Sequence, residues 1–247
     1  MTGEAKSPET CHRGIMPSEK EIYQTYTHQY DRLVQCEDYQ QNILPAIQQV
    51  ISLGSINILD IGAGTGRITR LLAPYAKMIF ASDESINMLQ IAKHRLLASG
   101  FTNWHCSTAN HVRIPLMGSI VDLIISGWSF SYLAVWGGKN WRSKLETGWI
   151  EMQRLLRPQG RIIFLETLGT GYESPNPPEH LNQYYNWLRE KGFNFKWVRT
   201  DYRFSSLAEA EELSGFFFGE EMRKKVIENQ WVILPECTAI WWCYIYN

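Results

Sequence analysis

The stretch Leu59-Asp60-Ile61-Gly62-Ala63-Gly64-Thr65-Gly66 joins a short apolar run to three glycines at alternate positions. The apolar run, residues 56–61, predicts a buried strand, and the apolar spacing from Ile68 onward predicts a helix. Glycine permits positive φ and a close approach of the backbone to a ligand. The unpaired N–H groups at the start of a helix attract a negative group. We therefore expect a strand, a ligand-binding turn and a helix in succession.

The same alternation of strand and helix continues on both sides of this unit. Strands are predicted at residues 56–61, 77–82, 104–108, 120–126 and 161–166, and later at 193–204 and 237–246, with helical patterns near 21–34, 43–51, 68–72, 86–97, 140–156, 181–190 and 206–229. Apolar strands that alternate with helices indicate a parallel sheet covered on both faces. Ligands of such sheets bind at the carboxyl ends of the strands, so the residues that follow each strand are the candidates for a site.

Composition excludes several classes of protein. The 247 residues are 45% hydrophobic and 20% charged, which is enough to bury a core. Lys+Arg 24 against Asp+Glu 25 gives a net charge of −1, without the basic excess typical of nucleic-acid or anionic-membrane binding. No apolar run is long enough to span a bilayer, and the first residues lack a signal-peptide core. Five scattered cysteines without metal-site spacing favour reduced thiols, no metal site and a cytoplasmic location.

A second carboxylate follows the second predicted strand. Asp83 lies at the end of that strand, where a carboxylate can accept two hydrogen bonds from ribose hydroxyls. The glycine pattern differs from the nicotinamide-type G-x-G-x-x-G, and it lacks the Gly-Lys-Ser/Thr of a phosphate-binding loop. The alternative is structural: the glycines form only a tight turn, and Asp83 caps the helix that begins near Ser85.

Five segments together resemble the class I S-adenosylmethionine-dependent methyltransferases. These segments are 59–66, 82–89 (SDESINML), 110–116 (NHVRIPL), 121–126 (VDLIIS) and 151–163, and the resemblance covers about residues 20–166. It implies an α/β, Rossmann-like fold with a seven-stranded, mostly parallel sheet, helices on both faces and an N-terminal helical lid. It also implies a flexible tail at 1–17 and a single methyltransferase domain at 18–247. Within that domain, 18–54 would form the N-terminal helices, 55–166 the cofactor-binding half and 167–247 the substrate-side half.

The resemblance also implies a set of cofactor-binding positions for S-adenosyl-L-methionine. The loop would hold the methionine portion with Asp60 near its amino group, Asp83 would hold the ribose, and Glu84 would lie against the adenine. Asn110 stands where the family usually has an acid that binds the adenine amino group, and its amide oxygen can still accept that bond. The full set is Asp60, Gly62, Ala63, Gly64, Gly66, Asp83, Glu84, Asn110, His111 and Ser126.

Aromatic residues suggest the substrate side. The expected pocket residues are Trp128 and Tyr132, which follow the fourth strand, and Tyr23, Tyr26 and Tyr30, which share one stripe of the N-terminal helix. Their rings would suit a flat apolar substrate or a cationic amine. The alternative for aromatic residues such as Trp149, Trp241 and Trp242 is a place in the core. No catalytic base is evident; His180 and Tyr26 are candidates, and a surface role is the alternative for His180.

These observations favour a methyltransferase that passes a methyl group to an oxygen or nitrogen of a small molecule by in-line displacement. In such a reaction the protein contributes mainly alignment. Alternatives are an RNA or protein methyltransferase, or a regulatory protein that binds S-adenosylmethionine without catalysis. The expected partner is a small-molecule methyl acceptor, with no strong nucleic-acid signal and no membrane association, and the chain is expected to be a monomer or homodimer.

Overall fold

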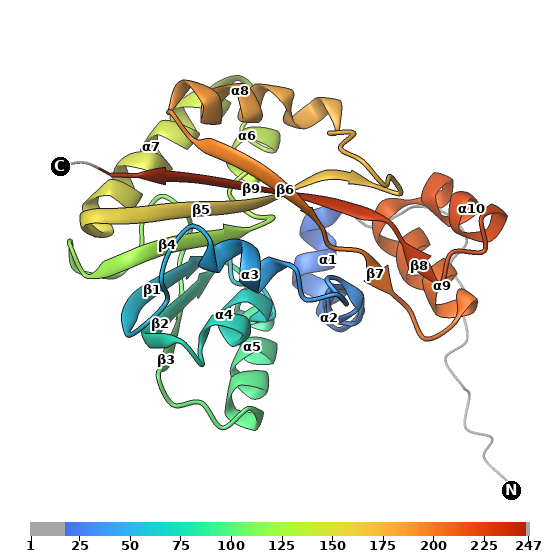
Figure 1. Ribbon diagram of the computed structural model, residues 1–247, viewed down its shortest axis with the longest axis horizontal. Coiled ribbons are helices and arrows are strands. Elements are labelled where there is room, and N and C mark those ends of the chain that lie inside the picture. Colours follow the sequence, from blue (N-terminus) through green and yellow to red (C-terminus); the bar gives the residue numbers. More distant parts are fainter. Residues whose placement is uncertain (1–17, 246–247) are drawn as a thin grey trace, which may run out of the picture.

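A seven-stranded sheet forms the centre of the protein (Figure 1). The structure is a computed structural model and describes residues 18–245, so the predicted tail at 1–17 lies outside the described part. The strands run in the order β3-β2-β1-β4-β5-β9-β6. They are β1 (Ile56–Ile61), β2 (Ala76–Asp83), β3 (Trp104–Thr108), β4 (Val121–Gly127), β5 (Leu156–Thr170), β6 (Asn194–Arg199) and β9 (Glu236–Tyr244). The first five are parallel, and β9 is antiparallel to both β5 and β6, which confirms the predicted mostly parallel sheet.

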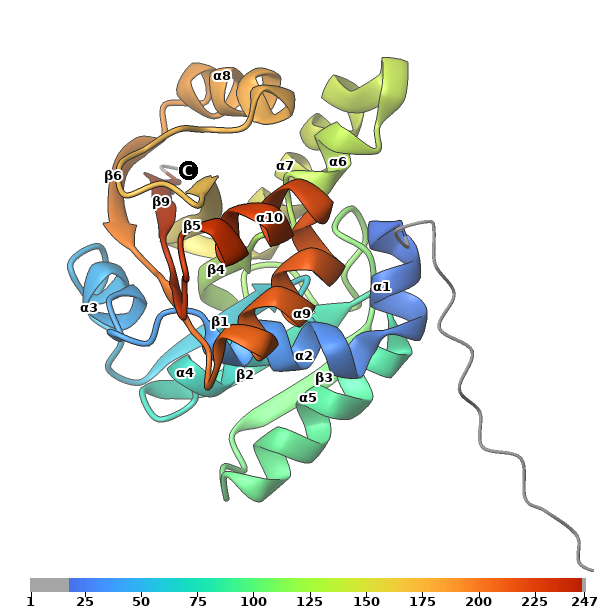
Figure 2. The same cartoon turned by 90° about the vertical axis from the view of Figure 1, so that its right-hand side faces the viewer.

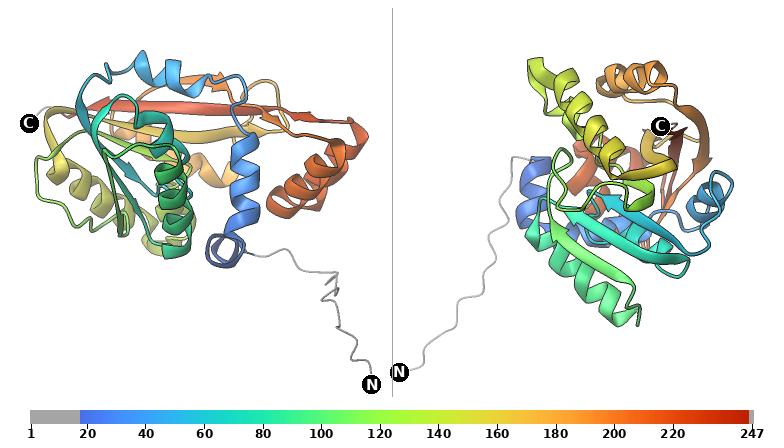
Figure 3. Two further views of the ribbon diagram at one scale, coloured as in Figure 1. Left: turned by 90° about the horizontal axis from the view of Figure 1, so that it is seen from below. Right: turned by 90° about the vertical axis from the view of Figure 1, so that its left-hand side faces the viewer.

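Helices cover both faces of this sheet (Figures 1 and 3). They are α1 (Glu19–Thr25), α2 (Thr27–Cys36), α3 (Ile43–Gln48), α4 (Arg67–Leu72), α5 (Ile86–Ala98), α6 (Tyr132–Val135), α7 (Trp141–Leu155), α8 (Asn182–Glu190), α9 (Leu207–Phe218) and α10 (Glu220–Glu228). Successive residues of a strand point to opposite faces. Ile58 of β1 therefore packs in the cluster with α3 and α4, whereas Leu59 packs in the cluster with α7 and α8. The apolar run of β1 is buried because both of its faces are covered.

The N-terminal helices α1 and α2 lie beside the sheet, where the resemblance implied a lid, and we call this helix pair the lid (Figure 2). A capping box begins α1, because Ser18 Oγ accepts a hydrogen bond from Glu21 N and Ser18 N donates to Glu21 Oε2. Leu33 of α2 is buried in a third apolar cluster with α9 and α10. The lid is thus packed between the glycine-loop side of the sheet and the α9–α10 pair.

Two late segments differ from their predictions. The predicted helix at 206–229 is two helices, because Gly219 takes φ 95° between α9 and α10. The predicted strand at 193–204 is split: β6 ends at Arg199, and β7 (Tyr202–Arg203) pairs with β8 (Ile233–Leu234) in a separate ribbon. Asp201 lies at the break, where it accepts hydrogen bonds from the Arg199 guanidinium and from Glu236 N. Among residues 18–245, no helix is both long and apolar enough to cross a bilayer.

Candidate active site

The glycine loop lies at the carboxyl end of β1 and needs residues without side chains. Gly62, Gly64 and Gly66 all have positive φ, at 69°, 55° and 82°. A Cβ at Gly62 would lie 1.9 Å from Ser129 Oγ, and one at Gly66 would lie 2.9 Å from Ala92 Cβ. Gly62 therefore allows the β4–α6 connection to approach the loop, whereas Gly66 allows α4 to pack against α5.

Asp83 ties this loop to the start of α5. Its Oδ2 accepts a hydrogen bond from Gly64 N at 2.9 Å, and its Oδ1 accepts one from Ser85 N at 2.8 Å. The N-cap of α5 is Ser85, whose Oγ accepts from Met88 N, and Asp83 supports the same helix start through its bond to Ser85 N. A carboxylate oxygen has two acceptor sites, so each oxygen of Asp83 can still accept a bond from a ligand hydroxyl. Burial raises the pKa of Asp83 above its usual range.

A cavity of about 570 Å³ opens beside the loop, between the lid and the carboxyl ends of β1, β2 and β4. Nine of the predicted site residues line it: Tyr23, Tyr30, Gly62, Gly64, Asp83, Glu84, His111, Trp128 and Tyr132. The sequence prediction missed further lining residues, which include Gln24, Ser129, Leu133, Trp136 and Lys144. Trp136 follows Tyr132 by four residues, and that helical spacing is the signal that could have identified it.

Two predicted residues lie behind the loop in a smaller hollow next to this cavity. Asp60 and Ala63 line that hollow together with Tyr30 and Trp128, and the last two residues border both spaces. Asp60 is buried and its Oδ2 accepts a hydrogen bond from Thr69 Oγ1 at 2.6 Å. Burial raises the pKa of Asp60 to about 7. A nearby cation would favour its ionised form.

Five predicted residues line neither space: Gly66, whose role is the close packing of α4 on α5, and Asn110, Ser126, Tyr26 and His180. Asn110 is exposed and its Oδ1 accepts a bond from Val112 N, because the side chain closes its own turn. Ser126 is fully buried and its Oγ accepts from Phe130 N. Tyr26, expected in the pocket and a candidate base, is exposed where α1 meets α2, and its ring packs edge-on against Phe216. His180, the other candidate base, is exposed in a short 3₁₀ turn outside the cavity lining.

Aromatic side chains form the wall between the lid and α6. The hydroxyl groups of Tyr23 and Tyr132 lie 2.6 Å apart and share a hydrogen bond. The Tyr132 ring stacks on Trp136 with centroids 4.2 Å apart, and the Tyr23 ring lies edge-on to Tyr30 at 5.2 Å. The wall thus joins α1, α2 and α6 across the cavity mouth. Such faces suit flat or cationic groups.

His111 and Ser129 form a polar pair inside the cavity. Their Nε2 and Oγ atoms lie 2.8 Å apart, and the imidazole packs edge-on against Phe130. Burial lowers the pKa of His111 to about 4, so the ring is neutral at pH 7. A neutral imidazole adds no positive charge that would repel a cationic ligand.

Trp128 is held in an uncommon backbone conformation next to the loop. Its φ is 52°, and its N–H donates to Leu165 O at 2.7 Å. The Arg67 guanidinium lies 4.0 Å from the ring centroid and pairs with the buried carboxylate of Glu37. Positive φ in a bulky residue is costly and persists where the surroundings enforce it. Here the lid-side ion pair and the strand end together fix the indole between the two hollows.

Comparisons with known proteins agree with this geometry. Residues 59–164 match the family model described as a methyltransferase domain. The chain is 25% identical over 158 residues to an uncharacterized methyltransferase of Bacillus cytotoxicus. The aligned residues are 62% of this chain and 69% of the relative. It is 27% identical to a malonyl-[acyl-carrier protein] O-methyltransferase of Serratia marcescens, over 56% of this chain and 52% of the relative. It is 34% identical to a ubiquinone/menaquinone biosynthesis C-methyltransferase of Hahella chejuensis, over 44% of this chain and 42% of the relative.

The chain therefore spans about half the length of the last two relatives. Among solved structures, a SAM-dependent methyltransferase from Aquifex aeolicus shares the fold, with a TM-score of 0.56 and 15% identity over 83% of this chain and 90% of that one. Residues 59–164 thus match a methyltransferase domain, and the fold and the relatives support a class I S-adenosylmethionine-dependent methyltransferase with S-adenosyl-L-methionine as its cofactor.

The residues present fit this cofactor. The glycine loop has no side chains that would fill the space beside it, and Asp83 keeps acceptor capacity for two hydroxyls. Asp60 is a buried carboxylate behind the loop and could neutralise an ammonium group. The bound cofactor would supply a methyl group already activated on a sulfonium. Among the described residues, no group of three or more His, Cys, Asp or Glu side chains is placed to hold a metal ion.

Proposed function

We propose that this enzyme transfers the methyl group to an oxygen or nitrogen of a small molecule. The observation that carries the proposal is the size of the aromatic-walled cavity. A pocket for one drug-sized ligand measures roughly 300–1,000 Å³, and this cavity of about 570 Å³ must hold the cofactor as well as the acceptor. The remaining space suits a compact acceptor.

The polar groups of the cavity support an O–H or N–H acceptor. The neutral imidazole of His111 and the hydroxyl of Ser129 are the hydrogen-bonding pair on the side of β4. A neutral imidazole can accept a hydrogen bond from an O–H or N–H group, whereas a C–H group is a poor donor. The two named relatives with assigned chemistry include an O- and a C-methyltransferase, so a carbon acceptor is the outcome to test against.

Radiolabelled methyl transfer tests the proposal. The protein is incubated with S-adenosyl-L-methionine labelled on its methyl group and with a cell extract, which is then separated into metabolites, RNA and protein. We expect label in the metabolite fraction, and none with Asp83→Ala. Label confined to RNA or protein would overturn the small-molecule proposal.

A catalytically inert regulatory role makes a different prediction. Cofactor binding by calorimetry without transfer to any fraction would favour that role. Fragmentation of the labelled metabolite in mass spectrometry then locates the new methyl group and so identifies the acceptor atom.

A further inference from the structure

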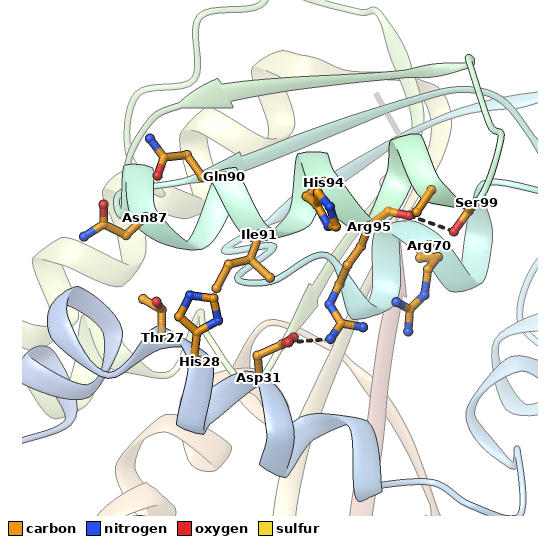
Figure 4. Close-up of a pocket in the computed structure, with 11 residues that line it drawn as sticks. Thr27, His28, Asp31, Arg70, Asn87, Gln90, Ile91, His94, Arg95 and Ser99 are labelled. Atoms are coloured by element: carbon orange, nitrogen blue, oxygen red, sulfur yellow. Dashed lines mark hydrogen bonds and ion pairs between the residues drawn. The ribbon is translucent and has the colours of Figure 1, made fainter.

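A second cavity lies outside the cofactor site, between the lid helix α2 and helix α5 (Figure 4). It measures about 830 Å³, and α4 contributes one residue to it. The polar and charged side chains that line it include His28 and Asp31 of α2, Arg70 of α4, and Asn87, His94 and Arg95 of α5. We call it the α2–α5 groove.

The α2–α5 groove is separate from the cofactor cavity. Helix α2 divides them, because Tyr30 lines the cofactor cavity whereas His28 and Asp31 line the groove. Asn87 at the start of α5 is the one lining residue that the two spaces share. A ligand in the groove would therefore contact the outer side of the lid.

Two guanidinium groups, those of Arg70 and Arg95, lie near a single carboxylate in the groove, that of Asp31. Arg95 pairs with Asp31, whose Oδ2 also accepts a bond from Gln35 Nε2 (Figure 4). Among the described residues, no carboxylate lies within ion-pair distance of Arg70, although this side chain is partly buried. Burial and the positive charge of Arg95 lower the pKa of Arg70, and the charge of Asp31 offsets them only in part. Two partly buried guanidinium groups with one carboxylate between them leave a net positive charge, and burial of uncompensated charge is costly, so a bound anion would stabilise this arrangement.

We propose that the α2–α5 groove binds a small phosphomonoester. Guanidinium groups present paired donors that match phosphate oxygens, and Arg70 and Arg95 extend toward the same space (Figure 4). The side chains of His28 and His94 line the same groove and can bond the polar part of the ligand. Two guanidinium groups match one phosphoryl group, whereas nucleic acid presents a row of phosphates and calls for a longer basic surface.

Occupation of the groove would also hold the lid. Helix α1 is already tied to the start of α5, since Ser85 Oγ donates to Tyr23 O and Asn87 Nδ2 donates to Gln24 O, each at 2.8 Å. A phosphoryl group bound by Arg95 of α5 and by donors of α2 would add a further link between these helices. Because Tyr23 and Tyr30 line the cofactor cavity, a ligand that favours the closed lid should strengthen cofactor binding, and the effect is reciprocal.

Calorimetry with the full-length protein tests the site. Ribose 5-phosphate is the probe, and we expect saturable binding of one molecule per chain that saturating S-adenosylhomocysteine does not compete away. Arg70→Gln should weaken that binding by about tenfold or more, as loss of one charged bidentate contact does. The variant Arg70→Lys, which keeps the charge, should weaken it less. Arg113→Gln is the matched control, since Arg113 is exposed and lines neither cavity, and it should bind like wild type.

The comparison ligands separate the possible sources of phosphate. Ribose should not bind, and inorganic phosphate should bind more weakly than ribose 5-phosphate. Equal affinity of the wild type and Arg70→Gln, or competition by S-adenosylhomocysteine, would overturn the proposal. Tight binding of a short single-stranded oligonucleotide without binding of ribose 5-phosphate would also overturn it. The effect on the lid requires that saturating ribose 5-phosphate tighten S-adenosylhomocysteine binding; unchanged affinity would refute that part.

Discussion

The close approach of Ser129 to Gly62 makes Gly62→Ala the sharpest test of the glycine loop. Alanine at φ 69° costs about 1–2 kcal/mol in backbone strain. Its Cβ would also lie 1.9 Å from Ser129 Oγ and 2.5 Å from Ser129 Cβ, and the second contact cannot be relieved by rotation of the hydroxyl. Forced overpacking of this kind costs roughly 1–3 kcal/mol more. We expect a total loss of about 2–5 kcal/mol in the free energy of unfolding.

Gly192→Ala is the matched control for backbone strain. Gly192 has φ 78°, and a Cβ there would meet nothing within 4 Å, so this variant should lose only about 1–2 kcal/mol. Both variants are measured by chemical denaturation, and their affinity for S-adenosylhomocysteine is measured by calorimetry. Gly62→Ala should also weaken binding by about tenfold or more, because displacement of Ser129 disturbs His111 and the cavity wall.

A double-mutant cycle then tests the contact itself. Ser129→Gly removes both atoms that meet the new Cβ, so the double variant Gly62→Ala/Ser129→Gly should recover about 1–3 kcal/mol relative to the sum of the single changes. The reasoning would be refuted if Gly62→Ala matched Gly192→Ala in both stability and affinity, or if the cycle showed no coupling.

Four further predictions concern carboxylates and the lid. Asp83→Ala should weaken S-adenosylhomocysteine binding by about 2–4 kcal/mol through loss of two charge-assisted hydrogen bonds, and unchanged affinity by calorimetry would remove Asp83 from the site. With a pKa of about 7, the Asp60 carboxyl is partly protonated at pH 7, and the binding of an ammonium group beside it should release this proton. Calorimetry in buffers of different ionisation enthalpy should detect the release, and Asp60→Asn should abolish the release. Tyr23→Phe removes the 2.6 Å bond to Tyr132 and should weaken cofactor binding by about 0.5–1.5 kcal/mol; an equal effect on unfolding without any on binding would contradict a lid role. Burial raises the pKa of Glu236 to about 8, so between pH 4.5 and 8 the folded state keeps a proton that the unfolded state, with its ordinary pKa of 4.5, has lost. The free energy of unfolding should therefore fall as the pH rises from about 4.5 to 8. Thermal melts of Glu236→Gln should show a flatter dependence on pH.

The sequence was sufficient for the parts of the fold that rest on local patterns. The strand and turn around Gly62 were predicted because an apolar run next to spaced glycines has one stable arrangement on a parallel sheet. The break of the predicted strand at 193–204 was not predicted. It depends on the bonds of Asp201 to Arg199 and Glu236, and Glu236 comes from a strand far along the chain.

The three tyrosines of the N-terminal helices also could not be placed correctly from local sequence pattern alone. Tyr23, Tyr26 and Tyr30 share one helical stripe, yet α1 ends at Thr25 and α2 begins at Thr27. This break turns Tyr26 outward to Phe216, while Tyr23 and Tyr30 line the cavity. A helical period assumes a continuous helix, so it could not reveal which of the three rings leaves the stripe.

The position of β9 has a consequence for synthesis of the chain. Residues 236–244 emerge last among the described strands, yet β9 lies between β5 and β6 and pairs with both (Figure 1). Until they leave the ribosome, β6 has no neighbour in the sheet and the long edge of β5 is uncovered, which is a hazard for association with other chains. A stop codon upstream of residue 236 would therefore leave the glycine loop intact in sequence and still yield a protein prone to aggregate.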